Sequence, residues 1–384
     1  MRETDRAAIA SMRAAREQAR LDDLDRLLCH AVPEAGELQG RLRTSLEQCH
    51  RPVDQFAKRI GEGAADLAPP GSGVEVNSLV NEVVALLLTR LLRERGMDSD
   101  AFDVAEALLS ELTALAAVPT LVLGHSQDRE QHDCIHGRAD LRFPGSRVWD
   151  VPFLAHEFGH HAVAHLPDRR PELRDRRPLR DSVRDRLRDQ LARQEWPLAA
   201  SASEHADELV ADAVATVCCG PAYVVATLCL RVPEEPEASV PRPSHPAWRD
   251  RVAVMRETLN ELTRQTCLGR YAAQREDPVD LLAVAVLGQP PEARGVYRDA
   301  ARQTVEKILA HRKDLVYRDG DAAIDVQERL GQRKENPPER ATVAAVLDGG
   351  WRWRLAHPAR TEDNTTARLI AQYCREIAKG RRHG

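Results

Sequence analysis

Hydrophobic residues recur every three or four positions through most of the chain, which is the spacing of one face of an α-helix. Residues 1–67 follow this pattern until a Pro-Pro-Gly-Ser-Gly sequence at 69–73 interrupts it. The pattern resumes over residues 74–95 and 102–117, and fragments of it continue beyond residue 265. We therefore predict a mainly α-helical protein.

Two short stretches depart from the helical spacing. Residues 120–123 follow Pro119, and residues 134–143 alternate partly between apolar and polar side chains before a Pro-Gly sequence at 144–145. Both features are typical of strands, so a small β-sheet is expected. We further expect an edge of this sheet to pair with the main chain of an extended peptide.

A helix that begins near residue 150 is apolar on several sides, as a buried helix requires. Asp150 is expected to cap its N-terminus and Pro152 to lie in its first turn. The helix contains an H-E-x-x-H motif made by His156, Glu157 and His160. The two histidines lie one turn apart and project from nearly the same face, so they can bind one zinc ion. Glu157 is suited to take a proton from metal-bound water.

A third metal ligand must come from elsewhere in the chain. Zinc peptidases of the astacin and collagenase type would need a glycine at position 163 and a histidine at position 166. This chain has Val163 and Leu166 there, so that class is excluded. The other common solution is a carboxylate from a second helix.

The helix predicted from Ser203 to Gly220 supplies such a carboxylate. Ser203 is expected to cap its start, and Gly220 with Pro221 marks its end. Glu208 and Asp212 lie one turn apart on this mostly apolar helix, where buried acids are costly unless a cation neutralises them. Glu208 is therefore expected to bind zinc, and Asp212 to accept the second N–H of a ligating histidine.

Two alternatives bear on the acids of this helix. Glu208 and Asp212 could form a solvent-facing acidic stripe together with Glu204 and Asp207. Asp207 is also a weaker ligand candidate, because adjacent residues of a helix point about 100° apart.

Two further short motifs follow the acids, namely Gly220-Pro221-Ala222 and His245-Pro246, the latter followed by Arg251. The order H-E-x-x-H, E-x-x-x-D, Gly-Pro-Ala and His-Pro resembles the gluzincin zinc peptidases. It is most similar to the soluble relatives of the CAAX-prenyl-protease and heat-shock membrane endopeptidase family, and the resemblance covers about residues 135–260. It implies a zincin-like catalytic core with zinc ligands His156, His160 and Glu208, catalytic Glu157, supporting Asp212, and His245 and Arg251 near the site.

The implied activity is hydrolysis of peptide bonds with one zinc ion as the cofactor. Zinc lowers the pKa of its bound water to about 7. Glu157 would take the water proton and pass it to the leaving amine, while His245 would donate to the developing oxyanion. The chain departs from the family in its long, charged interval between His160 and Glu208 and in lacking the family's transmembrane helices. The substrate class is therefore not carried over.

The favoured interpretation is a cytoplasmic zinc endopeptidase of narrow specificity, with a protein or peptide substrate and a regulatory, stress or defence role. Narrow specificity is expected because a broad protease would be harmful in the cytoplasm. The alternative is a non-catalytic helical binding or scaffold protein with a structural metal. A closed structural zinc site normally has four protein ligands, whereas only three are convincing here. A further alternative is a zymogen-like state in which residues 233–246 or a terminal helix block the cleft.

Composition excludes several other classes of function. The chain has 384 residues and a net charge of −5, and its basic residues are interleaved with acids, which argues against nucleic acid as a partner. The longest apolar run, residues 209–230, contains an acid and a Gly-Pro break, so no membrane segment is expected. The first residues are charged rather than apolar, which favours a cytoplasmic location. The eight cysteines form no C-x-x-C pair, so a zinc finger is not expected.

The predicted organisation has three parts. Residues 1–67 form an N-terminal helical region, residues 74–265 the zincin-like metallopeptidase core, and residues 266–384 a C-terminal helical region. Within the core, the metal site spans 156–212 and the His-Pro motif occupies 245–246.

One more helix is predicted between the two metal-binding helices. Residues 169–194 are rich in Arg and Asp, and Leu179, Val183, Leu187 and Leu191 recur every four positions. This pattern favours a solvated helix docked by its apolar stripe. The alternatives are a lid over the cleft and a basic rim that selects acidic substrates.

Overall fold

A computed structural model of the chain describes residues 3–31, 50–51, 53–55, 57–59, 62, 100–116, 121–124, 131–135, 138–142, 147–165, 183–193, 201–233, 236–266, 278–291, 294–313, 315–358 and 364–382. Within these ranges the chain is mostly helical, which confirms the prediction of a mainly α protein. The helix predicted over residues 74–95 lies outside the described residues.

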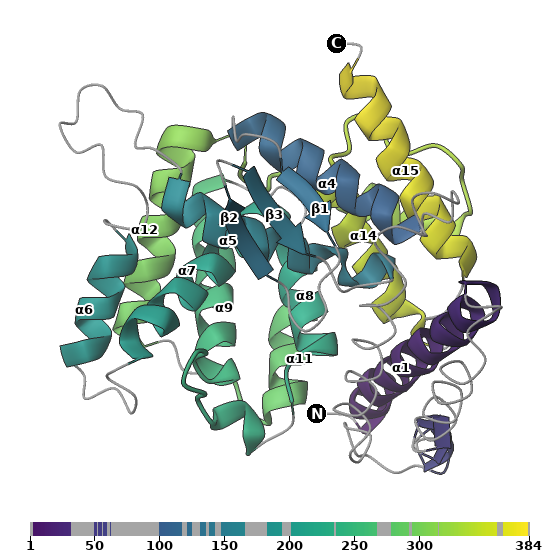
Figure 1. Cartoon of the computed structure of the whole chain (residues 1–384), viewed down its shortest axis with the longest axis horizontal. Coiled ribbons are helices and arrows are strands. Elements are labelled where there is room, and N and C mark those ends of the chain that lie inside the picture. Colours follow the sequence, from purple (N-terminus) through teal and green to yellow (C-terminus); the bar gives the residue numbers. More distant parts are fainter. Residues whose placement is uncertain are drawn as a thin grey trace.

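The elements are named as in Figure 1. The α-helices are α1 (Glu3–Ala31), α4 (Asp100–Ala116), α5 (Leu154–His165), α6 (Asp185–Arg193), α7 (Ala202–Cys219), α8 (Pro221–Leu230), α9 (Trp248–Thr266), α11 (Pro278–Leu287), α12 (Gly295–Arg312), α13 (Gly320–Gly331), α14 (Val343–Ala356) and α15 (Asn364–Arg382). Two 3₁₀ helices, η1 (Val148–Phe153) and η4 (Glu237–Ser239), accompany them. The strands are β1 (Leu121–Gly124), β2 (Gln131–Ile135) and β3 (Arg138–Arg142).

The three strands pair in the order β1-β3-β2. β1 runs parallel to β3, with Leu121 opposite Ala139, and β2 runs antiparallel to β3. Both β2 and β3 lie beside α5. The pairing of a sheet edge with a substrate peptide stays a prediction.

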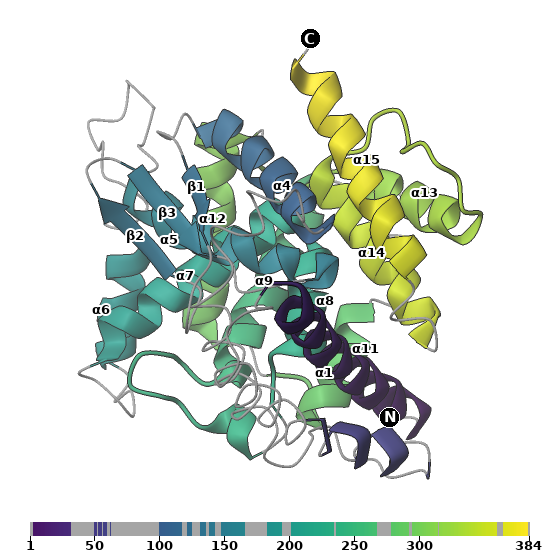
Figure 2. The same ribbon diagram turned by 45° about the vertical axis from the view of Figure 1, so that its right-hand side comes forward.

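One cluster of buried apolar side chains links helices from both ends of the chain, with members such as Ile9 of α1, Leu209 of α7 and Tyr373 of α15. The elements that follow η1 supply most of it. In Figure 2, α13, α14 and α15 gather on one side of α8, while α6 lies on the opposite side, beyond α7. The division into residues 1–67, 74–265 and 266–384 stays a prediction. No helix in the described part of the chain is long and apolar enough to cross a bilayer.

The entry to α5 differs from the prediction. A 3₁₀ helix that contains Pro152 precedes α5, and Asp150 lies inside it rather than at an N-cap. The Asp150 carboxylate is buried and accepts a hydrogen bond of 2.7 Å from Arg16 Nη2 of α1. The predicted cap is therefore wrong, because a charged partner from a distant helix takes the carboxylate that would have served the local main chain.

The start of α7 also differs from the prediction, whereas its end agrees. Ser201 occupies the N-cap without a side-chain hydrogen bond, so Ser203 lies within the first turn and the predicted cap is wrong. The helix ends at Gly220, and Pro221 begins α8, as predicted. Gly220 has φ +57°, and a methyl group there would lie 2.4 Å from the Tyr317 ring. Glycine is required at this turn on both counts.

The two helices of the metal site approach each other at Gly159. A Cβ atom placed on Gly159 would lie 2.7 Å from the main-chain oxygen of Ala211, which is too close for any real contact. The missing side chain lets α7 come close enough to α5 for their polar residues to meet. Glycine in a helix interior destabilises the helix by about 1 kcal/mol relative to alanine. The close approach of the two helices therefore requires a residue that α5 by itself would disfavour.

Replacing Gly159 by alanine is expected to lower the free energy of unfolding by about 1–3 kcal/mol, because the two backbones must separate. Urea denaturation measures the change. Gly380→Ala in α15 is the matched control, since nothing lies within 4 Å of a Cβ added there. That variant should be neutral or slightly stabilised. Equal responses of the two variants would contradict the close-packing role of Gly159.

Candidate metal centre

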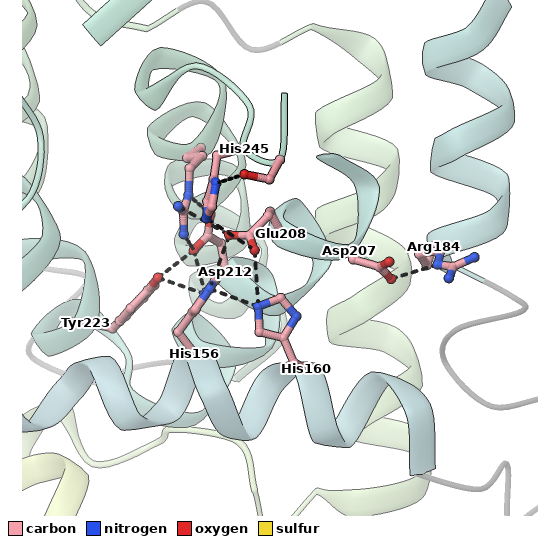
Figure 3. A network of polar contacts seen from close by, with 10 residues as sticks. His156, His160, Arg184, Asp207, Glu208, Asp212, Tyr223 and His245 are labelled. Atoms are coloured by element: carbon pink, nitrogen blue, oxygen red, sulfur yellow. Dashed lines mark hydrogen bonds and ion pairs between the residues drawn. The ribbon is translucent and has the colours of Figure 1, made fainter. Parts of the chain in front are cut away.

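Three side chains from two helices converge on one point. His156 and His160 of α5 place their Nε2 atoms 3.1 Å apart. Glu208 of α7 places Oε2 3.3 Å from His156 Nε2 and Oε1 3.4 Å from His160 Nε2. Figure 3 shows the two rings rising from α5 toward the carboxylate. The structure therefore brings together the three ligands expected from the sequence.

The three groups fit a metal ion. The two imidazole nitrogens and the carboxylate oxygen that could bind a metal all lie within 4.8 Å of one another. Oε2 of Glu208 is buried and accepts no hydrogen bond of good geometry from a described residue, although His156 Nε2 and Arg251 Nη1 each lie 3.3 Å from it. A cation between this oxygen and the two imidazoles would satisfy it better than these long contacts do.

Asp207 does not belong to this group. Its carboxylate accepts a 2.7 Å hydrogen bond from Arg184 Nε, just before α6, and points away from the histidines (Figure 3). Its neighbour Glu208 is largely buried, whereas the Asp207 side chain is 35% exposed. The rotation of about 100° between adjacent helical residues accounts for the difference.

Asp212, one turn after Glu208, contacts His156 on the ring nitrogen opposite to the one that faces Glu208. Its Oδ1 lies 3.0 Å from His156 Nδ1, and both of its oxygens accept hydrogen bonds from Arg251 of α9, at 2.7 and 2.8 Å. The carboxylate is fully buried. A proton on Nδ1 of His156 faces this carboxylate, which leaves Nε2 free to bind a metal.

The charges of these buried groups depend on one another. Burial disfavours the charged form of His156, but the carboxylates of Asp212 and Glu208 outweigh burial and raise the histidine pKa to about 10. Burial also opposes the charge of Asp212, but Arg251 and His156 lower the pKa of Asp212 to about 2. The pKa of Glu208 is likewise lowered, against burial, chiefly by Arg251. Without a metal, His156 therefore holds an extra proton that a metal ion must displace.

Arg251 joins the two acids of α7. Its Nη1 lies 3.3 Å from Glu208 Oε2 in addition to the bonds with Asp212. The guanidinium stacks over the Trp248 ring, 4.4 Å from its centroid, and is buried. Arg251 was expected near the site, and the structure places it there as a buried partner of both acids.

Tyr223 of α8 is a member of the site that sequence reasoning missed. Its hydroxyl donates to Asp212 Oδ1 at 2.5 Å and lies 3.3 Å from His156 Nδ1. Its ring is nearly parallel to the His156 imidazole, with centroids 6.2 Å apart. One signal was present in the sequence: a tyrosine in the third position of a largely apolar helix needs a partner for its hydroxyl when the helix is buried.

His245 faces the centre without joining the ligand group. Its Nε2 lies 3.8 Å from Glu208 Oε1, and its side chain is 37% exposed, much more than those of the three ligands. Nδ1 lies 2.7 Å from Ser244 Oγ (Figure 3). An imidazole so placed can donate to a group bound beside the metal ion.

Glu157 is buried on α5, at 4% exposure, directly after His156 in the chain. His161, one turn further on the same helix, is buried as well. His165 lies four residues after His161, and its side chain is outside the described residues.

The predicted helix between the metal-binding helices is present in part as α6. Leu187 and Leu191 are buried, so the apolar stripe docks the helix as expected, while Leu179 lies outside the described residues. Arg184 is buried and bound to Asp185 and Asp207. This arginine is thus neutralised, which does not favour a basic rim at this point.

No family model, no curated protein and no solved structure matches this chain. The function is therefore inferred from the residues of the centre.

Proposed function

We propose that this protein is a zinc-dependent metallopeptidase that hydrolyses peptide bonds of a protein or peptide substrate. The observation that carries the proposal is the convergence of His156, His160 and Glu208, whose ligand atoms lie within 4.8 Å of one another. Two imidazole nitrogens and one carboxylate are the ligand set of several catalytic zinc sites. The likeness of the sequence motifs to gluzincins, with their zincin-like core, supports the same proposal.

When bound, a zinc ion supplies a water whose pKa is lowered to about 7 and a positive charge that polarises a carbonyl group. His156, His160 and Glu208 would hold the ion, and Asp212 would keep His156 in the tautomer that leaves Nε2 free. Buried Glu157 would accept the proton of the attacking water and deliver it to the leaving amine. His245 would donate from Nε2 to the oxygen that becomes negative in the transition state, where one such donor is worth about 10²–10³ in rate.

The alternative is a helical binding protein in which the metal is purely structural. Structural zinc sites are normally closed by four protein ligands. A further candidate among the described residues, His245, lies 3.8 Å from Glu208 and outside the group of three. The group of three ligands among the described residues, with the partly exposed His245 imidazole beside it, favours catalysis. Narrow specificity, a cytoplasmic location and a regulatory, stress or defence role remain parts of the proposal.

Zinc binding and hydrolysis are expected to be lost together when Glu208 is changed to glutamine. The amide is a poor zinc ligand, so we expect affinity to fall by more than about 100-fold, beyond the usual effect of losing a supporting residue. Asp207→Asn is the matched control on the neighbouring position and should keep both properties. Metal analysis, combined with cleavage of a peptide library before and after chelation and zinc addition, measures both.

Three results would contradict the proposal. Hydrolysis that survives chelation would exclude a metal-dependent mechanism. Equal zinc affinities of Glu208→Gln and Asp207→Asn would exclude the ligand set. A tightly bound zinc ion without cleavage of any library peptide would favour the structural alternative.

A further inference from the structure

The segment that carries His245 is a tight turn between η4 and α9. Arg242 N donates to His245 O at 2.8 Å, and His245 N donates to Arg242 O at 3.2 Å, which closes residues 242–245 into a narrow bridge. Prolines at 241, 243 and 246 restrict the main chain on both sides. The turn thus has little internal freedom, and its position is set by what holds it from outside.

One buried side chain of α7 holds this turn. His205 is fully buried, and its Nε2 lies 2.8 Å from the carbonyl oxygen of Arg242. A carbonyl only accepts hydrogen bonds, so His205 must carry its proton on Nε2. The same oxygen accepts the main-chain N–H of His245. A single atom of the turn therefore links His205 to the backbone of His245.

His205 lies three residues before Glu208 on the same helix, so the two side chains come from nearly the same face. α7 thereby sets the position of a metal ligand and, through Arg242, that of the turn that carries His245. Two further hydrogen bonds in this region are exposed: Arg249 Nε of α9 donates to Ser239 Oγ at 2.8 Å, and Arg242 Nη2 donates to Glu237 Oε1 at 3.0 Å. An exposed hydrogen bond exchanges readily with water, so the bond from His205 is the strongest of these three.

We propose that His205 is a positioning residue: it fixes the turn 242–245 so that the His245 imidazole stands beside the metal centre at the place where a substrate oxygen becomes negative. This inference rests on the proposed function for its catalytic consequence, but the attachment itself can be tested without any substrate.

The direction of the His245 ring follows from its own neighbour. Ser244 Oγ lies 2.7 Å from His245 Nδ1. When the hydroxyl donates to Nδ1, the proton of the neutral ring lies on Nε2, the atom that faces Glu208. His205 then fixes the backbone and Ser244 the ring, so that an N–H is directed into the centre.

Two amide variants separate the hydrogen bond from the volume of the side chain. The terminal nitrogen of glutamine reaches about the place of His Nε2, whereas that of asparagine reaches only the place of Nδ1. His205→Gln is expected to keep kcat within about threefold, and His205→Asn to lower it about ten- to a hundredfold with little change in KM, because misplacement of a catalytic group by about 1 Å has effects of this size. Glu204→Gln, exposed on the same helix, is the control and should match the unchanged protein.

A mutant cycle shows whether the effect passes through His245. In the His245→Ala background, His205→Asn should reduce kcat by less than about twofold, since the donor it positions is already gone. Zinc content and thermal stability are measured for every variant, so that rates refer to folded, metal-loaded enzyme. Multiplicative effects of the two substitutions would overturn the proposal, and so would equal kcat values for the Gln and Asn variants.

Amide hydrogen exchange tests the attachment by itself. His205→Asn should speed exchange at the main-chain N–H of His245 by about tenfold or more, whereas His205→Gln and Glu204→Gln should not. If the unchanged protein cleaves nothing, the proposed function fails, and this measurement still decides whether His205 holds the turn. Unchanged exchange in His205→Asn would refute the attachment even in an active peptidase.

Discussion

Glu157→Gln is expected to lower the rate of peptide hydrolysis by about 10²–10⁴-fold while zinc remains bound. The amide keeps the shape of the side chain but cannot accept a proton from water, and the ligands His156, His160 and Glu208 are not altered. Single-turnover cleavage of a fluorogenic peptide, with metal content determined on the same sample, measures both quantities. Because Glu157 is buried, a substitution that changes the shape of its side chain would also disturb the packing, and glutamine avoids this.

The matched control for this variant is Glu204→Gln, which makes the same chemical change on the exposed side of α7. It should leave rate and zinc content as they are. Turnover by Glu157→Gln at the rate of the unchanged protein would reject Glu157 as the general base. Loss of zinc in this variant would instead show that its carboxylate is needed to form the centre.

Asp212→Ala is expected to lower the free energy of unfolding by about 3–5 kcal/mol, because it leaves the buried guanidinium of Arg251 without its main partner. The carboxylate is fully buried between Arg251, His156 and Tyr223. Urea denaturation of the metal-free protein measures the effect without a contribution from zinc. The affinity for zinc should fall as well, by about 10–100-fold, since His156 loses the group that orients it.

A double substitution shows whether the cost comes from the uncompensated charge. Asp212→Ala combined with Arg251→Met should be less destabilised than the sum of the two single variants, because neither buried partner is left alone. Glu204→Ala, on the exposed side of the same helix, should change stability by less than about 0.5 kcal/mol. If the two effects simply add, the ion pair is not the source of the loss.

The sequence could predict those residues of the centre whose relative positions depend only on their spacing within one helix. His156 and His160 must share a face, as must Glu208 and Asp212, whatever the rest of the protein does. Their meeting across two helices followed from the cost of burying two acids on an apolar helix. The structure brings these four side chains together at distances of 3.0–3.4 Å.

The remaining members depend on packing between elements that are distant in sequence. Gly159 looks like a poor helix residue until Ala211 of α7 is seen against it. Tyr223 and His205 have no motif of their own, and their partners lie 11 and 37 residues away. The two predicted caps were wrong for a related reason. The side chain of Asp150 is taken by Arg16 of α1, and Ser203 is displaced by a helix that starts earlier.

The common origin of His205, Glu208 and Asp212 on α7 has a consequence for how this protein tolerates changes of length. These three side chains keep fixed positions relative to one another because they lie on one helix. One extra residue within the helix would rotate all the side chains that follow it by about 100° relative to those that precede it. After an insertion between His205 and Glu208, His205 could no longer contact the turn 242–245 while Glu208 and Asp212 face the two histidines. We therefore expect changes of chain length to be tolerated in the segments around α7 rather than between these three residues.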